Sequence, residues 1–224
     1  MFKNLLSFWK GKDFLAQVFE EFKEMLDQTE CMYKMVCNTL LDNVEEPELI
    51  KKIYEIDKKV NLLQKNIRKR IVEHLSLQPT VDVPACLLLM SVVKDAERLG
   101  DYAKNLCEVT GLLQKPIDRS VFSQYFGELD KDILTLFEQT KEAFIKADES
   151  KAESSWDYEH RLAIHCDRIV RQVVKSNLSV NEAVCFVLIA RHFKRMVAHL
   201  VNIATSVILP LSDLDYFDEK RRAE

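Results

Sequence analysis

The chain has 224 residues, of which 47% are hydrophobic and 30% are charged, and its net charge is −4. This length is sufficient to bury a sizeable core, in one large domain or two small ones. With only 4 Gly and 5 Pro, the chain lacks the turn residues that an all-β protein needs, so long helices with short loops are expected. Lys and Arg are scattered along an acidic chain, which argues against direct nucleic-acid binding.

The cysteines and the lack of a long apolar run indicate a cytoplasmic protein. No Cys-x-x-Cys pair occurs, and most of the cysteines lie in apolar stretches, as reduced core thiols do. The six are Cys31, Cys37, Cys86, Cys107, Cys166 and Cys185. No run of about 18 apolar residues is present, so no membrane span is predicted. The opening segment Met1 to Lys10 has two interpretations: peripheral association with a membrane surface, or packing on the bundle or on a second subunit.

Taken in chain order, turn-forming residues divide the chain into six segments with helical periodicity. The expected helices are 13–43, 47–77, 82–112, 120–147, 150–177 and 181–208. In the first, Leu15, Val18 and Phe22 begin a series of apolar residues at alternating steps of three and four. Prolines mark three of the intervening turns, and Pro210 closes the last helix. Helices of this length suit an all-α antiparallel bundle with short loops.

The second half of the chain repeats the first. Residues 96–106 align with 193–203, with the same apolar positions and with Arg and Asn at two matching places. Residues 22–32 are echoed by 133–143, with Thr at the same step. The sequence therefore predicts two tandem three-helix bundles. The expected divisions are 1–114 (repeat 1), 115–210 (repeat 2) and a C-terminal tail at 211–224, for which disorder is expected.

A pair of carboxylates in the third segment indicates a cation site. Glu97 and Asp101 are four residues apart, so both project from one face of a helix. Asp57 and Asn61 have the same spacing in the second segment, and if the two faces meet, three carboxylates and an amide oxygen converge. Such ligands suit Mg, Mn, Ca or iron. The alternative is surface ion pairs, for which the available cations are Lys58, Lys94 and Arg98.

Gly100 stands in the middle of the same segment. Glycine in a helix interior costs about 1 kcal/mol relative to alanine. Close approach of a neighbouring helix or of a ligand would explain its presence there.

Residues 95–105, Asp-Ala-Glu-Arg-Leu-Gly-Asp-Tyr-Ala-Lys-Asn, resemble the signature helix of the PhoU family of phosphate-signalling regulators. Residues 57–61 and 78–80 resemble that family's second helix and the following turn, and the likeness covers nearly the whole chain in two repeats. The resemblance implies six helices in two bundles, with metal sites built from paired E/D-x-x-x-D motifs. In repeat 1 it implies a metal ion (Fe, Mg, Mn or Zn) held by Asp57, Asn61, Glu97 and Asp101.

Repeat 2 departs from the family pattern. Glu97 and Asp101 are replaced by Lys194 and Ala198, and Gly100 by a valine. Glu159 aligns with Asp57, but an alanine aligns with Asn61. Because an ammonium group repels a cation, we predict no metal of the family type in repeat 2.

Four histidines in repeat 2 could form a different kind of metal site. His192 and His199 are seven residues apart on one helix face, and His160 and His165 lie on the neighbouring helix, so a zinc or iron site is one interpretation. The alternative for His199, which aligns with Tyr102, is a partly buried packing residue.

The resemblance implies a regulator that restrains phosphate uptake and signalling. The partners it implies are a phosphate-specific ABC transporter, its sensor histidine kinase or a sodium–phosphate cotransporter, and it implies a homodimer. No nucleophile–base motif, phosphate-cradling loop or nucleotide fingerprint is present, so no enzyme is predicted. Two alternatives stay open: a metalloprotein whose cluster stores metal or carries out redox chemistry, and a metal-free helical scaffold that acts through dimerisation.

Overall fold

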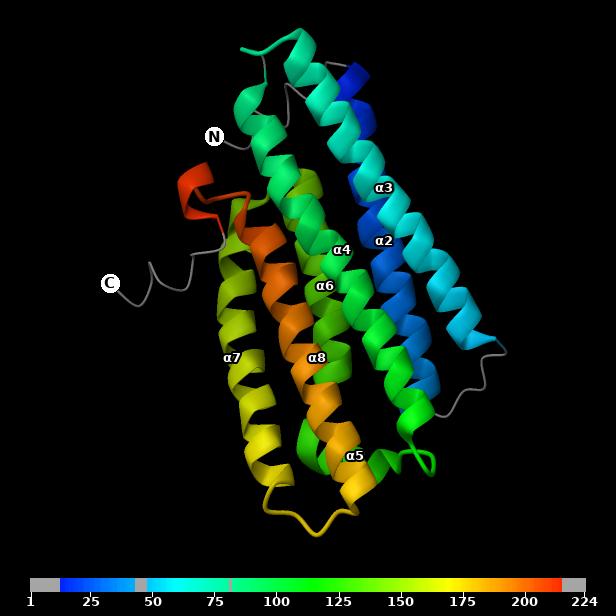
Figure 1. Cartoon of the computed structure of the whole chain (residues 1–224). Coiled ribbons are helices and arrows are strands. Elements are labelled where there is room, and N and C mark those ends of the chain that lie inside the picture. The colour runs from blue at the N-terminus through cyan, green and yellow to red at the C-terminus, as the bar shows by residue number, and fades with distance from the viewer. Residues whose placement is uncertain (1–12, 43–47, 81, 215–224) are drawn as a thin grey trace.

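A computed structural model describes residues 13–42, 48–80 and 82–214. Within these ranges the chain consists of helices and the loops that join them, without a strand (Figure 1). The elements are α2 (Asp13–Asp42), α3 (Leu49–Leu77), α4 (Val83–Leu112), α5 (Arg119–Phe126), α6 (Leu129–Lys146), α7 (Glu149–Val173), α8 (Val180–Thr205) and a short 3-10 helix, η1 (Leu211–Asp213). The all-α prediction is confirmed. The segment Met1 to Lys10 lies outside the described residues.

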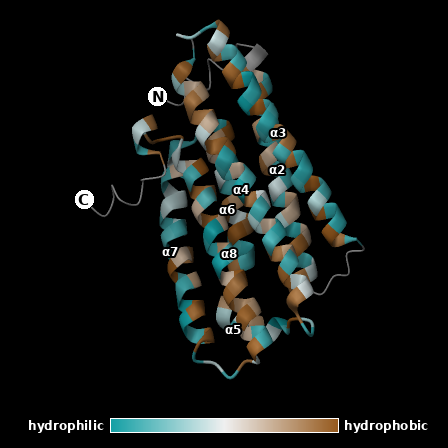
Figure 2. Ribbon diagram, in the orientation of Figure 1, coloured by the Kyte–Doolittle hydropathy of each residue, from teal (hydrophilic) through white to brown (hydrophobic). Residues whose placement is uncertain are grey.

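The long helices form two groups of three. α2, α3 and α4 pack on one another, and α6, α7 and α8 do the same, with α5 against α7. α4 lies along α8, and α2 contacts α6, so the two groups share one continuous core (Figure 1). Each helix turns an apolar stripe inward, which Figure 2 shows as brown bands between teal ones. Among the described helices, none combines the length and apolarity needed to cross a membrane.

The helix expected at 120–147 is in fact two helices, α5 and α6. Gly127 separates them, and its φ of +58° is a backbone conformation that favours glycine. The backbone N–H of Gly127 donates to the carbonyl of Ser123 at 3.0 Å and thereby closes α5. Phe126 and Leu129, on either side of the break, are both fully buried. The apolar periodicity continues through the break, and for that reason the sequence pattern did not reveal it.

Aromatic side chains fix how repeat 1 lies on repeat 2. Tyr33 of α2 is fully buried, and its hydroxyl donates to the backbone carbonyl of Asp130 in α6 at 3.0 Å. The ring of Tyr33 lies 5.7 Å from that of Phe137 and 5.9 Å from that of Phe193, measured between centroids. Burial of several aromatic rings at one junction, each with a preferred geometry, holds the two groups in a single register.

The tail begins with an ordered turn. Pro210 is followed by η1, in which the backbone N–H of Asp213 donates to the carbonyl of Pro210 at 3.0 Å. The expectation of disorder directly after Pro210 is therefore wrong for residues 211–214. The rest of the tail, 215–224, lies outside the described residues.

Candidate functional site

The structure brings three of the four predicted residues of α3 and α4 together around a lysine. Lys104 Nζ of α4 donates to Asp101 Oδ1 at 3.1 Å and, across the helix interface, to Asp57 Oδ2 at 3.3 Å. Asn61 Nδ2 donates to the same Asp57 oxygen at 3.2 Å. The two helix faces therefore meet, but two of the three expected carboxylates converge there, with an ammonium group between them.

The remaining acid, Glu97, lies one turn away beside Arg98. Arg98 Nη1 donates to Asp101 Oδ2 at 2.7 Å, and its Nε lies 3.7 Å from Glu97 Oε2. Burial raises the pKa of Glu97, and the charge of Asp101 raises it further, while Arg98 and Arg68 oppose this. Arg98 was one of the cations expected if these acids formed surface ion pairs, and it does contact both Glu97 and Asp101.

Lys104 is the functional residue that the sequence reasoning missed. Its ammonium lies 5.9 Å from the centroid of the Tyr54 ring, within range of a cation–π contact, and Tyr54 in turn donates to Glu108 at 3.1 Å. Burial lowers the pKa of Lys104, but its bonds to Asp101 and Asp57 outweigh burial and raise the pKa above the ordinary value. The Asp101–Lys104 spacing of three residues is a signal for an ion pair on one helix face. The contact with Asp57 depends on the register of α3 against α4, which the sequence does not give.

As they are arranged, these side chains do not fit a metal ion. A hard cation needs several oxygen ligands at about 2.0–2.6 Å, converging on one point. Here the point shared by Asp57 and Asp101 is taken by Lys104 Nζ. Across residues 13–42, 48–80 and 82–214, no group of three or more His, Cys, Asp or Glu side chains is placed to hold a metal ion. The metal site at Asp57, Asn61, Glu97 and Asp101 remains a prediction of the sequence.

Gly100 faces a neighbouring helix and not the carboxylates. It is buried, and a Cβ added there would lie 3.5 Å from Thr29 Cγ2 and 3.7 Å from Met32 Sδ, both on α2, and 3.8 Å from Val60 Cγ1 on α3. These are ordinary van der Waals distances. The neighbours of Gly100 are helices, but these distances leave room for a methyl group, so packing alone does not require glycine there.

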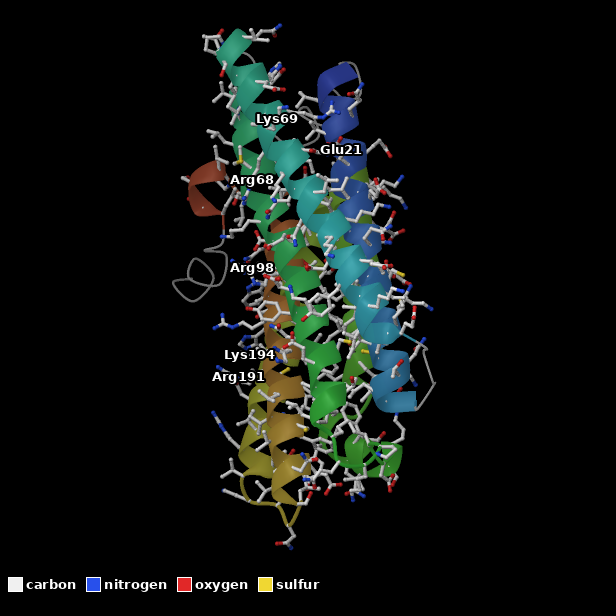
Figure 3. All side chains as sticks on the ribbon, turned by 45° about the vertical axis from the view of Figure 1, so that its right-hand side comes forward. Glu21, Arg68, Lys69, Arg98, Arg191 and Lys194 are labelled. Carbon is white, nitrogen blue, oxygen red and sulfur yellow. The ribbon has the colours of Figure 1, made fainter. Side chains whose placement is uncertain are left out.

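Repeat 2 places an ion pair where repeat 1 has Glu97. Lys194, which aligns with Glu97, donates to Asp167 of α7 at 2.6 Å, and Arg191 Nη1 lies 3.9 Å from the other oxygen of Asp167. In Figure 3, Arg68, Arg98, Lys194 and Arg191 follow one another along one side of the bundle. Both repeats therefore carry paired charges along this side.

The four histidines do not converge on one point, although two of them contact the same tyrosine. His160 stacks on Trp156, and His165 Nε2 lies 3.1 Å from the carbonyl oxygen of Tyr125. His199 stacks on Tyr102 with ring centroids 5.6 Å apart, and the ring of His192 lies 6.0 Å from that of Tyr102. The packing interpretation of His199 thus matches its surroundings.

His199 also has a charged partner that the sequence did not suggest. His199 Nδ1 lies 2.7 Å from Asp95 Oδ1, and Asn202 Nδ2 donates to the same oxygen at 3.3 Å. Asp95 is 1% exposed and lies on α4, whereas its two partners lie on α8. This buried contact joins the signature helices of the two repeats.

An all-helical chain of two similar three-helix groups, with a charged cluster on the last helix of each, defines a class of two-repeat bundle proteins. A family model described as the PhoU domain matches residues 22–110 and 127–207. The chain therefore belongs to the PhoU family.

Individual relatives match over most of their length. The PhoU homologue of Synechocystis sp., named a phosphate-specific transport system accessory protein, is 26% identical over 204 residues, which cover 86% of this chain and 87% of the relative. The homologue of Aquifex aeolicus, which carries the same name, is 25% identical over 80% of this chain and 86% of its own. The crystal structure of PhoU from Pseudomonas aeruginosa matches with a TM-score of 0.77 at 22% identity, over 87% of this chain and 95% of that chain.

Proposed function

We propose that this chain is a non-enzymatic regulator that restrains phosphate uptake and phosphate-starvation signalling. The observation that carries the proposal is the match of the PhoU domain to both repeats. It is supported by relatives, matched over at least 80% of both chains, that are named accessory proteins of a phosphate-specific transport system. The regulator would dock on the transporter, or on the sensor kinase that works with it, at the cytoplasmic face of the membrane, and would do so as a homodimer.

The side chains of the candidate site support a binding role over a catalytic one. Asp57 and Asp101 are engaged by Arg98 and Lys104 in ion pairs of 2.7–3.3 Å, so neither is held ready as a general base. Burial raises the pKa of Cys86 and Cys107 to about 11, which keeps both thiols protonated and poorly nucleophilic. These features leave docking as the activity that the chain is best equipped to perform.

The outer face of α3 is the surface that we propose for docking. α3 carries eight Lys and Arg against three Asp and Glu, in a chain whose net charge is −4. Its outer face consists of Lys58, Leu62, Lys65, Lys69 and Val72, all exposed, at alternating steps of four and three. Leu62 and Val72 are each 57% exposed. Apolar side chains between lysines fit an acidic protein surface with a small apolar centre, and we assign this surface to the transporter.

Deletion and complementation test this proposal. Deleting the gene should raise phosphate uptake at high external phosphate and switch on a phosphatase reporter, and the wild-type chain should restore both. Unchanged uptake and signalling in the deletion strain, together with no transporter or kinase recovered in pull-downs from membranes, would show that the proposal is wrong.

A matched pair of variants tests the docking surface. Leu62→Asp/Lys65→Glu should fail to restore regulation and should lose the transporter in pull-downs. Ile164→Asp/Arg168→Glu makes the same chemical changes at exposed positions of α7 and should behave as wild type. If the two double variants behave alike, the outer face of α3 is not the docking surface. That result would not contradict the proposed regulatory role.

A further inference from the structure

Lys104 occupies the place that a cation would take between α3 and α4. Its ammonium bonds one carboxylate from each helix, Asp57 and Asp101, at 3.3 and 3.1 Å. The side chain is 20% exposed, and the Asp57 side chain is 11% exposed. Shielding of this kind strengthens an ion pair relative to one at the open surface. The two helices are thus joined by a charge contact whose cation is part of the chain.

The charges around Lys104 are nearly balanced without any added ion. Three carboxylates are present, from Asp57, Glu97 and Asp101, and the positive groups in direct contact with them are Lys104 and Arg98. Arg68 adds a further favourable charge toward Glu97. A divalent cation would therefore meet positive groups already in place, and its binding would require Lys104 to leave both of its partners.

Repeat 2 contains a simpler lysine–aspartate contact, in which the lysine bonds one carboxylate instead of two. There the position of Glu97 is held by Lys194, and Asp167 of α7 supplies the acid at 2.6 Å. In each repeat, a lysine of the third helix of the group bonds an aspartate of the second. The two lysines do not align with each other, so the arrangement arises separately in each repeat.

We propose that the Lys104 ammonium permanently replaces the bound metal ion in repeat 1, with Lys194 as its counterpart in repeat 2, so that this chain is a metal-independent member of its family. The lysine supplies the cross-helix contact that a metal ion would otherwise make. Asp57 and Asp101, the candidate metal ligands, instead accept hydrogen bonds from the Lys104 ammonium. This inference is independent of the proposed function, because its test measures metal content and thermal unfolding of the purified chain.

The first arm of the experiment uses the wild-type chain, purified untagged and without chelator. We expect less than about 0.1 equivalent of Mg, Mn, Fe or Zn by elemental analysis, and EDTA or added Mn²⁺ should shift the melting temperature by less than about 1 °C. Near-stoichiometric metal that EDTA removes, with a fall in melting temperature, would overturn the proposal.

The second arm uses Lys104→Met, which keeps the unbranched side chain up to the position of Cε and removes the ammonium group with its charge. The melting temperature should fall by about 5 °C, as expected for loss of a shielded ion pair in a chain of this size. Added Mn²⁺ should recover at least half of that loss, and Mn²⁺ affinity measured by calorimetry should rise about tenfold or more over wild type. Lys104→Arg should retain most of the wild-type stability and should gain no Mn²⁺ binding.

Lys141→Met is the matched control. Lys141 also bridges two acids, Asp27 at 2.8 Å and Glu30 at 2.5 Å, but it lies outside the motif, and Lys34 remains on Glu30 in the variant. Its loss of stability should not be recovered by Mn²⁺. If Lys104→Met does not fold, Lys104→Gln, a milder change, can be used for the same measurements. A folded Lys104→Met or Lys104→Gln chain that gains no Mn²⁺ affinity over wild type would overturn the equivalence of lysine and metal.

Discussion

His199 Nδ1 lies 2.7 Å from Asp95 Oδ1, and this contact connects the two signature helices, α4 and α8, of the protein. In the alignment of the repeats, Asp95 corresponds to His192 and Tyr102 corresponds to His199. The contact of His192 with Tyr102 on the same interface is therefore the counterpart of the Asp95–His199 contact. The duplication has placed one aspartate–histidine contact and one aromatic pair at equivalent points of the junction.

Breaking the Asp95–His199 contact should loosen the junction of the repeats. Asp95 Oδ2 is buried without a hydrogen-bond partner in the described part of the chain, so the carboxylate depends on the contacts of Oδ1. We expect His199→Ala to lower the free energy of unfolding by about 2 kcal/mol and Asp95→Ala by about 3 kcal/mol.

A double-mutant cycle in urea at neutral pH measures the coupling between the two residues, which we expect to be about 1–2 kcal/mol. His160→Ala, at an exposed histidine that stacks on Trp156, is the control and should cost about 0.5 kcal/mol or less. A coupling energy near zero would mean that the contact does not hold the repeats together.

Glu30 should make the stability of the chain depend on pH. It is 5% exposed on α2 and accepts bonds from Lys141 of α6 at 2.5 Å and from Lys34 at 2.6 Å. Burial raises the pKa of Glu30, but the bonds from Lys141 and Lys34 outweigh burial, so the pKa is lowered overall. A lowered carboxyl pKa stabilises the folded state above the ordinary Glu value, and this stability is lost as pH falls through the lowered pKa.

Glu30→Gln should therefore cost about 2 kcal/mol at pH 7, and the difference from wild type should shrink toward about pH 3. Urea unfolding at several pH values checks this. Glu24→Gln is the control, because Glu24 is 43% exposed in its pair with Lys59 and should contribute about 0.5 kcal/mol. A Glu30→Gln penalty that does not change between pH 7 and about pH 3 would assign the effect to packing.

The fold was largely predictable from the sequence because apolar periodicity follows the helix directly. The break at Gly127 was not, since Phe126 and Leu129 keep the apolar pattern across it. A single residue with a positive φ changes the path of the backbone without changing which side chains are buried.

The site was predictable only within each helix. The spacing of Glu97 and Asp101 placed both acids on one face of α4, as found. The position of Lys104 between Asp57 and Asp101 depends on how α3 and α4 are staggered, and side-chain packing along the whole interface determines that stagger. Asp95 was overlooked for the same reason, because its partner His199 is more than a hundred residues away.

Neutralising Glu97 should not destabilise the protein. Burial and the charge of Asp101 raise the pKa of Glu97, so the ionised form is disfavoured in the folded state. With a raised carboxyl pKa, the cost is present at neutral pH and disappears as pH falls through that pKa. Glu97→Gln should therefore equal wild type at pH 7 or exceed it by about 0.5 kcal/mol, and the gain should vanish in acid.

Asp101→Asn is the contrasting variant, because Asp101 accepts bonds from both Arg98 and Lys104. It should lower the melting temperature in the same scanning-calorimetry series. A fall in stability for Glu97→Gln that depends on added divalent metal would support a metal ligand role for Glu97 and contradict metal independence.

Only one of the six cysteines should react readily in the native protein. Cys31 is exposed, and the other five are buried. Burial raises the pKa of Cys166 to about 12, so thiolate is scarce there in addition to being shielded. With Ellman's reagent at about pH 8, one thiol should react at once and five should react about 100-fold more slowly, at the rate of local opening. In Cys31→Ser the fast phase should disappear, and two or more fast thiols in wild type would contradict the described packing.

Substitutions at Gly100 test whether the packing around this residue requires glycine. An added Cβ would lie 3.5 Å or more from its neighbours Thr29, Met32 and Val60, so alanine fits without displacement. Alanine also favours the helix over glycine by about 1 kcal/mol, and Gly100→Ala should therefore raise the free energy of unfolding by about 0.5–1 kcal/mol. Gly111→Ala, in the same helix but with no atom within 4 Å of the added Cβ, reports helix propensity alone.

Gly100→Leu should instead cost about 2 kcal/mol, because its larger side chain would be forced between α4 and its neighbours. Destabilisation by Gly100→Ala, measured against Gly111→Ala, would show that α2, α3 and α4 are packed more closely around Gly100 than these distances indicate.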